Sequence, residues 1–197
     1  MHLTSTSSIG DAMDRSSIEA VALDLIAQRG FDAVKVQDIC NACHITKPTF
    51  YHYIPSKDDL LVSSYHMAAK AACKLIDEAG KKGSCWERMV ASFSVIFDEA
   101  ERFGCEQLGR VLAMNIKERH GNVSRSDYMT ERMVPLVREG QASGEFANNA
   151  EAELLYAAVA DIFQGLEYLW CESGGSFAWR EAFKSEAAAT LGARATK

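Results

Sequence analysis

A helix of about eight residues, with a proline near each end, restricts the fold of this chain more than any other feature. Thr46 suits its N-cap, because the threonine hydroxyl can accept a hydrogen bond from a first-turn amide, and Pro48 falls in the first turn, where proline is tolerated. Pro55 biases Ile54 away from helical angles and so ends the helix. A segment this short cannot build a core alone. It must therefore pack on neighbouring helices and leave one side available for contact.

Two helices are expected before this short helix and one directly after it. An apolar helix face is indicated by the spacing of Ile18, Val21, Ala22, Leu25 and Ile26. Ser16 and Glu19 have the spacing of a capping box at its start, and a second helix is expected from about Val36 to Cys43. Ser56 and Asp59 form another capping box, which starts the following helix. The N-terminal part is therefore predicted to be a helix-turn-helix with one supporting helix in front.

The outward arc of the short helix carries hydrogen-bond donors, while Ile45 and Phe50 are expected to point inward. The arc consists of Lys47, Thr49, Tyr51, His52 and Tyr53. A helix start of this kind offers amides and side-chain donors to phosphates, and its side chains can reach base edges. The contact that the segment suits is therefore double-stranded DNA.

The charge of this region is unusual for a DNA-binding segment. Residues 1–60 hold five Lys and Arg against eight Asp and Glu, a net charge of −3. Residues 39–57, however, contain Lys47 and Lys57 and no carboxylate. We therefore expect modest non-specific affinity, so that specificity depends on base contacts and on the geometry of a dimer.

Four segments of the N-terminal sequence follow a known pattern nearly in register: Gly30–Ala33, Val36–Ile39, Ile45–Tyr53 and Ser56–Leu61. Over roughly residues 14–62 the chain thereby resembles the TetR family of transcriptional regulators. The resemblance implies an all-α homodimer with an N-terminal three-helix helix-turn-helix domain and a larger helical ligand-binding and dimerisation domain. It further implies binding to a palindromic operator, most often as a repressor, and release by a small-molecule effector.

The chain departs from the family pattern at two positions. His44 stands in the turn where the family usually has glycine, so a histidine must adopt the left-handed conformation there. Lys35 stands where the family favours a capping Thr or Ser. Carried over position by position, the predicted DNA-binding residues are Lys35, Gln37, Thr46, Lys47, Pro48, Thr49, Tyr51, His52, Tyr53 and Lys57.

The sequence predicts three parts: a flexible arm over residues 1–12, the helix-turn-helix domain over 13–60, and the ligand-binding and dimerisation domain over 61–197. No run of 18 apolar residues predicts a membrane span, and no signal peptide is visible, so we expect a cytoplasmic protein. Motifs of hydrolases, P-loop proteins and metalloproteases do not occur. We therefore expect neither an enzyme nor a bound cofactor or metal.

The expected helix from Ala150 to Glu172 is apolar nearly all round, so it must be buried on two sides. One side suits the core and the other a partner subunit; the alternative is a central core helix of a monomer. The predicted dimer interface is Leu155, Val159, Ile162, Phe163, Leu166, Trp179 and Phe183. The resemblance places a ligand pocket, or alternatively ordinary core, at Phe93, Phe97, Leu112, Met114, Met129, Met133 and Trp170.

The six cysteines leave one alternative function open. Cys40, Cys43 and His44 match the C-x-x-C-H pattern of haem attachment, but that chemistry requires export, and packing explains the two thiols equally well. The other cysteines are too scattered to predict a zinc site. A thiol-sensing regulator that uses the same helix-turn-helix stays open, as does a helical interaction protein that no longer binds DNA.

Overall fold

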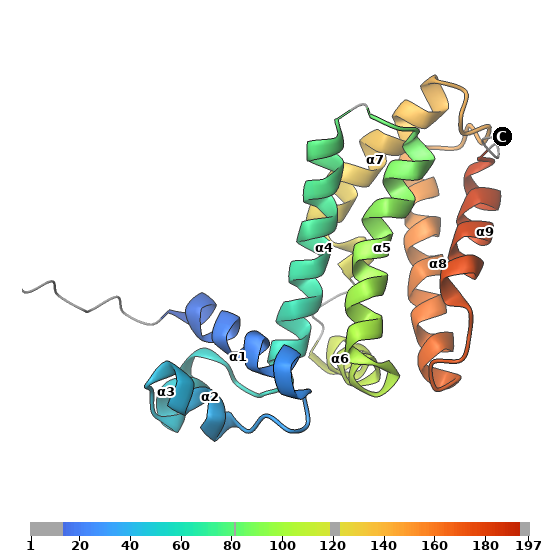
Figure 1. Ribbon diagram of the computed structural model, residues 1–197. Helices are drawn as coiled ribbons and strands as arrows, with labels where there is room; N and C mark the ends of the chain where they lie inside the picture. Colours follow the sequence, from blue (N-terminus) through green and yellow to red (C-terminus); the bar gives the residue numbers. More distant parts are fainter. Residues whose placement is uncertain (1–13, 81, 119–122, 194–197) are drawn as a thin grey trace, which may run out of the picture. The chain divides into compact units, whose positions relative to one another are not determined.

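The computed structural model describes residues 14–80, 82–118 and 123–193; the predicted flexible arm, residues 1–12, lies outside these ranges. The described residues form nine α-helices and one short 3-10 helix (Figure 1), which confirms the all-α class. The helices are α1 (Arg15–Arg29), α2 (Val36–Cys43), α3 (Lys47–Tyr53), α4 (Asp59–Ala79), α5 (Cys85–Phe103), α6 (Cys105–Glu118), η1 (Val123–Arg125), α7 (Asp127–Ala142), α8 (Ala152–Glu172) and α9 (Trp179–Leu191).

The chain divides after Leu60 into two compact units, which we call the head (to Leu60) and the body (from Leu61). The head contains α1, α2 and α3, and its core is formed by fully enclosed apolar side chains. These include Ile18, Ala22, Val34, Ile39, Phe50 and Ile54. Each of the larger side chains in this core, the valine, isoleucines and phenylalanine, stabilises the fold by about 1.5–3 kcal/mol when removed from water. The short helix α3 is therefore held by packing, as its length required.

The first helix of the head begins earlier than predicted. Asp14 is its N-cap: the Asp14 carboxylate accepts hydrogen bonds from the Ser17 amide (2.8 Å) and the Ser16 hydroxyl (3.0 Å). These bonds, that of the Ser17 amide above all, hold the pKa of Asp14 below its ordinary value. The predicted capping box of Ser16 and Glu19 is therefore wrong. Both Asp14 and Ser16 are good caps, but the earlier start lets Glu19 pair with Arg15 one turn away.

The body consists of α4 to α9, and α8 packs against α6, α7 and α9 (Figure 1). Phe93 and Phe97 of α5 meet Phe163 of α8 at 5.1 Å between ring centroids, and Phe183 of α9 lies 4.6 Å from Phe93. Trp179 at the start of α9 lies edge-on to Phe97 at 4.4 Å. This aromatic cluster fixes α9 on α5 and α8. Within the described residues, no helix has the length and apolar character needed to cross a membrane.

Candidate nucleic-acid interface

The turn between α2 and α3 is left-handed at His44, with φ 55° and ψ 38°. The His44 amide donates to the Asn41 carbonyl (3.3 Å), and the Ile45 amide donates to the Cys40 carbonyl (3.0 Å). A histidine can adopt this conformation, although glycine would do so with less strain. The structure therefore confirms the left-handed turn expected at this position and gives the two helices their sharp change of direction.

The start of α2 compensates for the lysine at its N-cap. Lys35 is extended, and the carboxylate of Asp38 accepts a hydrogen bond from the Lys35 amide at 2.8 Å. This bond is the reciprocal half of a capping box, supplied from the third helical residue. It also places a negative charge in the first turn, where the helix dipole favours it. The cap lost at Lys35 is thus partly replaced by Asp38, a role that the sequence analysis missed.

The recognition helix α3 begins and ends where the sequence predicts. The Thr49 amide donates to the Thr46 hydroxyl (3.3 Å), and the two threonine hydroxyl oxygens lie 2.8 Å apart. At the other end Ile54 is extended, with φ −129°. Ile54 and Phe50 are fully buried. The Thr46 cap, the extended Ile54 and the buried Phe50 side chain therefore fix which side of α3 faces outward.

Most predicted DNA-binding residues are exposed on the described head. The exposed set is Lys35, Gln37, Thr46, Lys47, Pro48, Tyr51 and His52, while Thr49, Tyr53 and Lys57 are half-buried. Tyr51 is 49% exposed, and its ring stands edge-on to Phe50 at 5.3 Å. The aromatic and basic groups of α3 are thus held on the outer side of the helix by a ring that belongs to the core.

Lys57 has a structural role that its sequence position did not reveal. Its ammonium donates to the carbonyl oxygens of Phe31 (2.5 Å) and Val34 (2.8 Å) and lies 4.0 Å from the centroid of the Phe31 ring. Two carbonyls and an aromatic face therefore surround the cation. Lys57 therefore holds the segment between α1 and α2, and its phosphate contact stays a prediction.

Comparison with known proteins agrees with this geometry. The family model of the bacterial regulatory proteins, tetR family, matches residues 18–63, which run from within α1 through α2 and α3 into the first turn of α4. The head is a TetR-family domain. Over 42 residues, 21% of this chain, the sequence is 50% identical to an uncharacterized HTH-type transcriptional regulator, YuxN of Bacillus subtilis. The match spans 14% of the length of that relative, so it concerns the domain and not the whole protein.

Solved regulator structures share the fold over most of the chain. FadR of Thermus thermophilus, a transcriptional repressor solved with lauroyl-CoA, covers 93% of this chain and 96% of its own, with a TM-score of 0.65 and 15% identity. The reduced form of NemR from E. coli covers 92% and 98%, with a TM-score of 0.59 and 16% identity. At such identities the similarity shows a common fold. The two-part helical architecture of the TetR family is therefore present here.

The structure places three of the predicted TetR-type pocket residues in or beside the aromatic cluster and the other four elsewhere in the body. Phe93 and Phe97 belong to the aromatic cluster, and Trp170 stacks on Trp179 at 4.9 Å. Met129 and Met133 are fully buried, and Met129 contacts the Cys73 thiol at 3.3 Å. Leu112 and Met114 on α6 are half-buried. These side chains pack mainly as core, and the pocket assigned to them stays a prediction.

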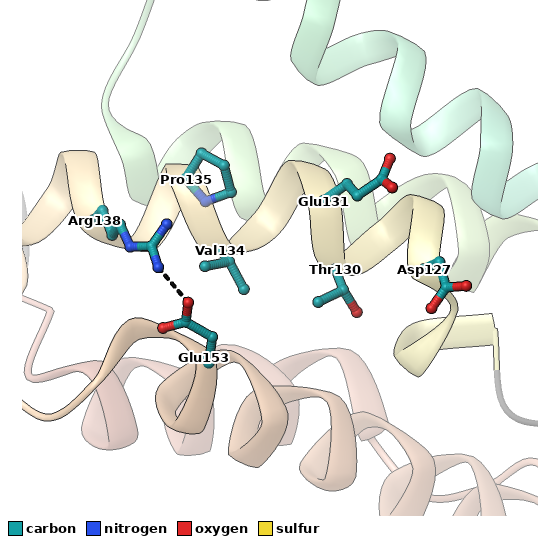
Figure 2. Close-up of a pocket in the computed structure, with 7 residues that line it drawn as sticks. All are labelled: Asp127, Thr130, Glu131, Val134, Pro135, Arg138 and Glu153. Atoms are coloured by element: carbon teal, nitrogen blue, oxygen red, sulfur yellow. Dashed lines mark hydrogen bonds and ion pairs between the residues drawn. The ribbon is translucent and has the colours of Figure 1, made fainter.

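A hollow of about 360 Å³ lies elsewhere, between α7 and the first turn of α8 (Figure 2). Its lining residues differ from all seven predicted ones: Asp127, Thr130, Glu131, Val134, Pro135, Arg138 and Glu153. An ion pair between Arg138 and Glu153 joins the two helices at one end, as Figure 2 shows. The hollow is open, and most of its lining side chains are polar or charged. It is therefore a surface groove and not an enclosed apolar ligand site.

The predicted TetR-type dimer residues face the interior of their own chain. Leu155, Val159, Phe163, Leu166, Trp179 and Phe183 are all buried, and Ile162 is half-buried. The large apolar side chains that α8 leaves exposed are Leu154 (64%), Tyr168 (60%) and Leu169 (43%). The apolar character of α8 is thus divided between a core side and an exposed side. The interface residues predicted on α8 lie on its core side, where Ile162 is half-buried.

All six cysteines are free thiols. Burial raises the pKa of Cys40, Cys43, Cys73 and Cys85, and that of Cys171 to about 11. A raised pKa leaves little thiolate at neutral pH, and the thiolate is the reactive form. Cys40 and Cys43 lie on the buried side of α2, so packing accounts for the C-x-x-C-H pattern. Among the described residues, no cluster of ligands suits a metal ion.

Proposed function

We propose that this protein is a ligand-responsive transcriptional regulator that represses by binding a palindromic operator as a homodimer. One observation carries the proposal: a TetR-family head presents an outward arc of α3 that is free of carboxylates and fixed by its own cap and anchors. A fixed arc is useful where side chains must meet a rigid duplex in one orientation.

The arc suggests a division of roles on DNA. Lys47, Tyr51 and Tyr53 would bind phosphates, which set the register of the head on the duplex. Gln37, Pro48 and Thr49 would contact base edges in the major groove. Two heads of a dimer would place α3 in successive major grooves, about one helical turn or slightly more apart, on a near-palindromic site.

The exposed side of α8 supports the homodimer. Along one helix face its residues are large, small, small and large: Leu154, Ala158, Gly165 and Leu169, at positions i, i+4, i+11 and i+15. This order is symmetric about the midpoint between residues 161 and 162. A two-fold axis there would bring Leu154 of each subunit to Leu169 of the other, and the small residues would let the helices approach closely. Large exposed apolar side chains on one helix face are typical of a protein interface, although Asp161, which pairs with Arg125, interrupts the apolar surface at this midpoint.

The effector site belongs to the body, because that unit provides the larger core. FadR, which shares this fold, was solved with lauroyl-CoA, and this supports a small-molecule effector in general without defining its chemistry here. Effector binding would favour a state in which the two heads no longer match the operator spacing, with a coupling of about 1–3 kcal/mol. The raised thiol pKa values give the thiol-sensing alternative no added support.

Selection of bound fragments from a genomic library, with the purified dimer at moderate salt, tests the proposal. We expect a short palindrome to be enriched. Lys47→Ala combined with Tyr51→Ala should then lower affinity for that operator by about 100-fold or more while the protein stays folded and dimeric, because at least two phosphate contacts are lost from each head. The matched control is Lys74→Ala, which removes an exposed lysine of the body. A folded dimer that enriches no sequence would overturn the proposal.

A further inference from the structure

Two exposed amide side chains are joined on the outer surface of α2. The Nε2 atom of Gln37 donates a hydrogen bond to Oδ1 of Asn41, one helical turn further along, at 2.9 Å. Both residues are exposed, and pairs of this type add little to helix stability. The bond matters more for orientation, because it removes freedom from a long side chain that would otherwise sample several rotamers.

The bond determines what the Gln37 amide can still offer to a ligand. A glutamine amide has two N–H donors and one carbonyl acceptor. With one N–H committed to Asn41, one donor and the acceptor are left. In the major groove, adenine presents an acceptor at N7 beside a donor at N6, and glutamine pairs with these two groups through its own donor and acceptor. Guanine presents two acceptors, N7 and O6, which this remaining pair fits less well.

The surroundings leave the amide accessible to DNA. The nearest carboxylate along the chain is that of Asp38, and it is directed back to the Lys35 amide at 2.8 Å. From residue 39 to residue 57 the sequence has no further Asp or Glu. Asn41 itself keeps its amide nitrogen for other contacts, since only its oxygen accepts from Gln37. A neutral, oriented amide therefore lies in a region without competing acidic groups.

We propose that Asn41 is a positioning residue that holds the Gln37 amide to read one adenine in each operator half-site. This inference rests on the proposed function and adds to it a base and the pair of residues that reads it. Asn41 does not itself need to touch the base. Its role is to set the direction in which Gln37 presents its donor and acceptor.

The test compares base preference, and not overall affinity, between variants. The selected operator is altered at each position in turn, and the ratio of affinities for adenine and for each other base is measured with the wild-type dimer, Gln37→Ala, Asn41→Ala and Asn41→Asp. We expect one position with an adenine preference of about tenfold or more in the wild-type protein, in the range of a bidentate pair. Gln37→Ala and Asn41→Ala should both reduce that preference to near unity at the same position.

Asn41→Asp is the matched control, because a carboxylate keeps the acceptor for Gln37. Its added negative charge should weaken binding to all sequences alike, and the adenine ratio at that position should persist. Retention of the preference in Asn41→Ala, together with its loss in Gln37→Ala, would show that Asn41 has no positioning role. A guanine preference at that position would also overturn the inference. A folded dimer that enriches no operator at all would instead count against the proposed function.

Discussion

In the head, the exposed side of α3 is set by residues three or four positions away along the chain, whereas in the body the exposed side of α8 is set by helices far away in sequence. Thr46 and Ile54 bound α3 locally, and Phe50 anchors it. α8 is apolar on two sides, and only its packing against α6, α7 and α9 distinguishes them. This difference explains why short-range signals in the sequence indicated the outward side chains of α3, whereas the interface residues predicted on α8 lie on its core side.

The largest effect is expected at Phe163, in the core of the body. Phe163 was predicted at the dimer interface, but it is fully buried among the rings of Phe93, Phe97 and Phe183. Phe163→Ala should therefore lower the free energy of unfolding by about 3–5 kcal/mol, through lost burial and the cavity left behind. Denaturant unfolding measures this change. Met67→Ala, at an exposed apolar side chain of α4, is the control and should stay within about 0.5 kcal/mol.

Substitutions on the exposed side of α8 should instead weaken dimerisation and leave stability nearly unchanged. Leu154→Asp combined with Leu169→Asp should raise the dimer dissociation constant by about 100-fold or more and leave the unfolding of the monomer little changed, because charges would be buried only in the dimer. Analytical ultracentrifugation over a range of concentrations measures the constant. Leu75→Asp, on the exposed side of α4, controls for added charge. An unchanged dimer in the double variant would exclude this face of α8.

Two lysines of the head are expected to have different roles, Lys57 in the stability of the fold and Lys47 in DNA binding. Lys57→Ala should destabilise the head by about 2 kcal/mol, because two charge-assisted hydrogen bonds and a cation–π contact are lost. Lys47→Ala should leave stability within about 0.5 kcal/mol but weaken operator binding and reduce its salt dependence, as expected for a phosphate contact. Hydrogen exchange and salt titrations of operator affinity measure the two effects. If Lys47→Ala instead lowered stability and Lys57→Ala instead weakened operator binding, the two assigned roles would be wrong.

The smallest expected effect concerns the turn of the head. His44→Gly should stabilise α2 and α3 by about 0.5–1 kcal/mol, since relief of the left-handed strain exceeds the added entropy of a glycine in the unfolded chain. The free energy of local opening can be measured by hydrogen exchange of the α2 and α3 amides. Gly30→Ala, at φ 84°, should change stability in the opposite direction. Destabilisation by His44→Gly would mean that the histidine side chain makes a contact of its own.

Much of the head could be predicted because its signals act over short distances. The Thr46 cap, the stop at Ile54, the capping box of Ser56 and Asp59 and the left-handed His44 all appear as expected. The error at Asp14 arose because two good caps lie two residues apart, and local rules rank them almost equally. Asp38 and Asn41 were missed although their partners lie only three and four residues away.

The sequence by itself determined the all-α class, the helix-turn-helix and the outward arc of α3, because each depends on hydrogen bonds and periodicities within a few residues. Only the tertiary structure decided that Lys57 turns to the carbonyls of Phe31 and Val34, and that the carboxylate of Glu145 accepts from the amides of Cys85 and Trp86. It also decided which side of α8 is core. Apolar burial has no direction of its own, so a helix with two apolar sides is oriented by the neighbours that reach it first and pack best.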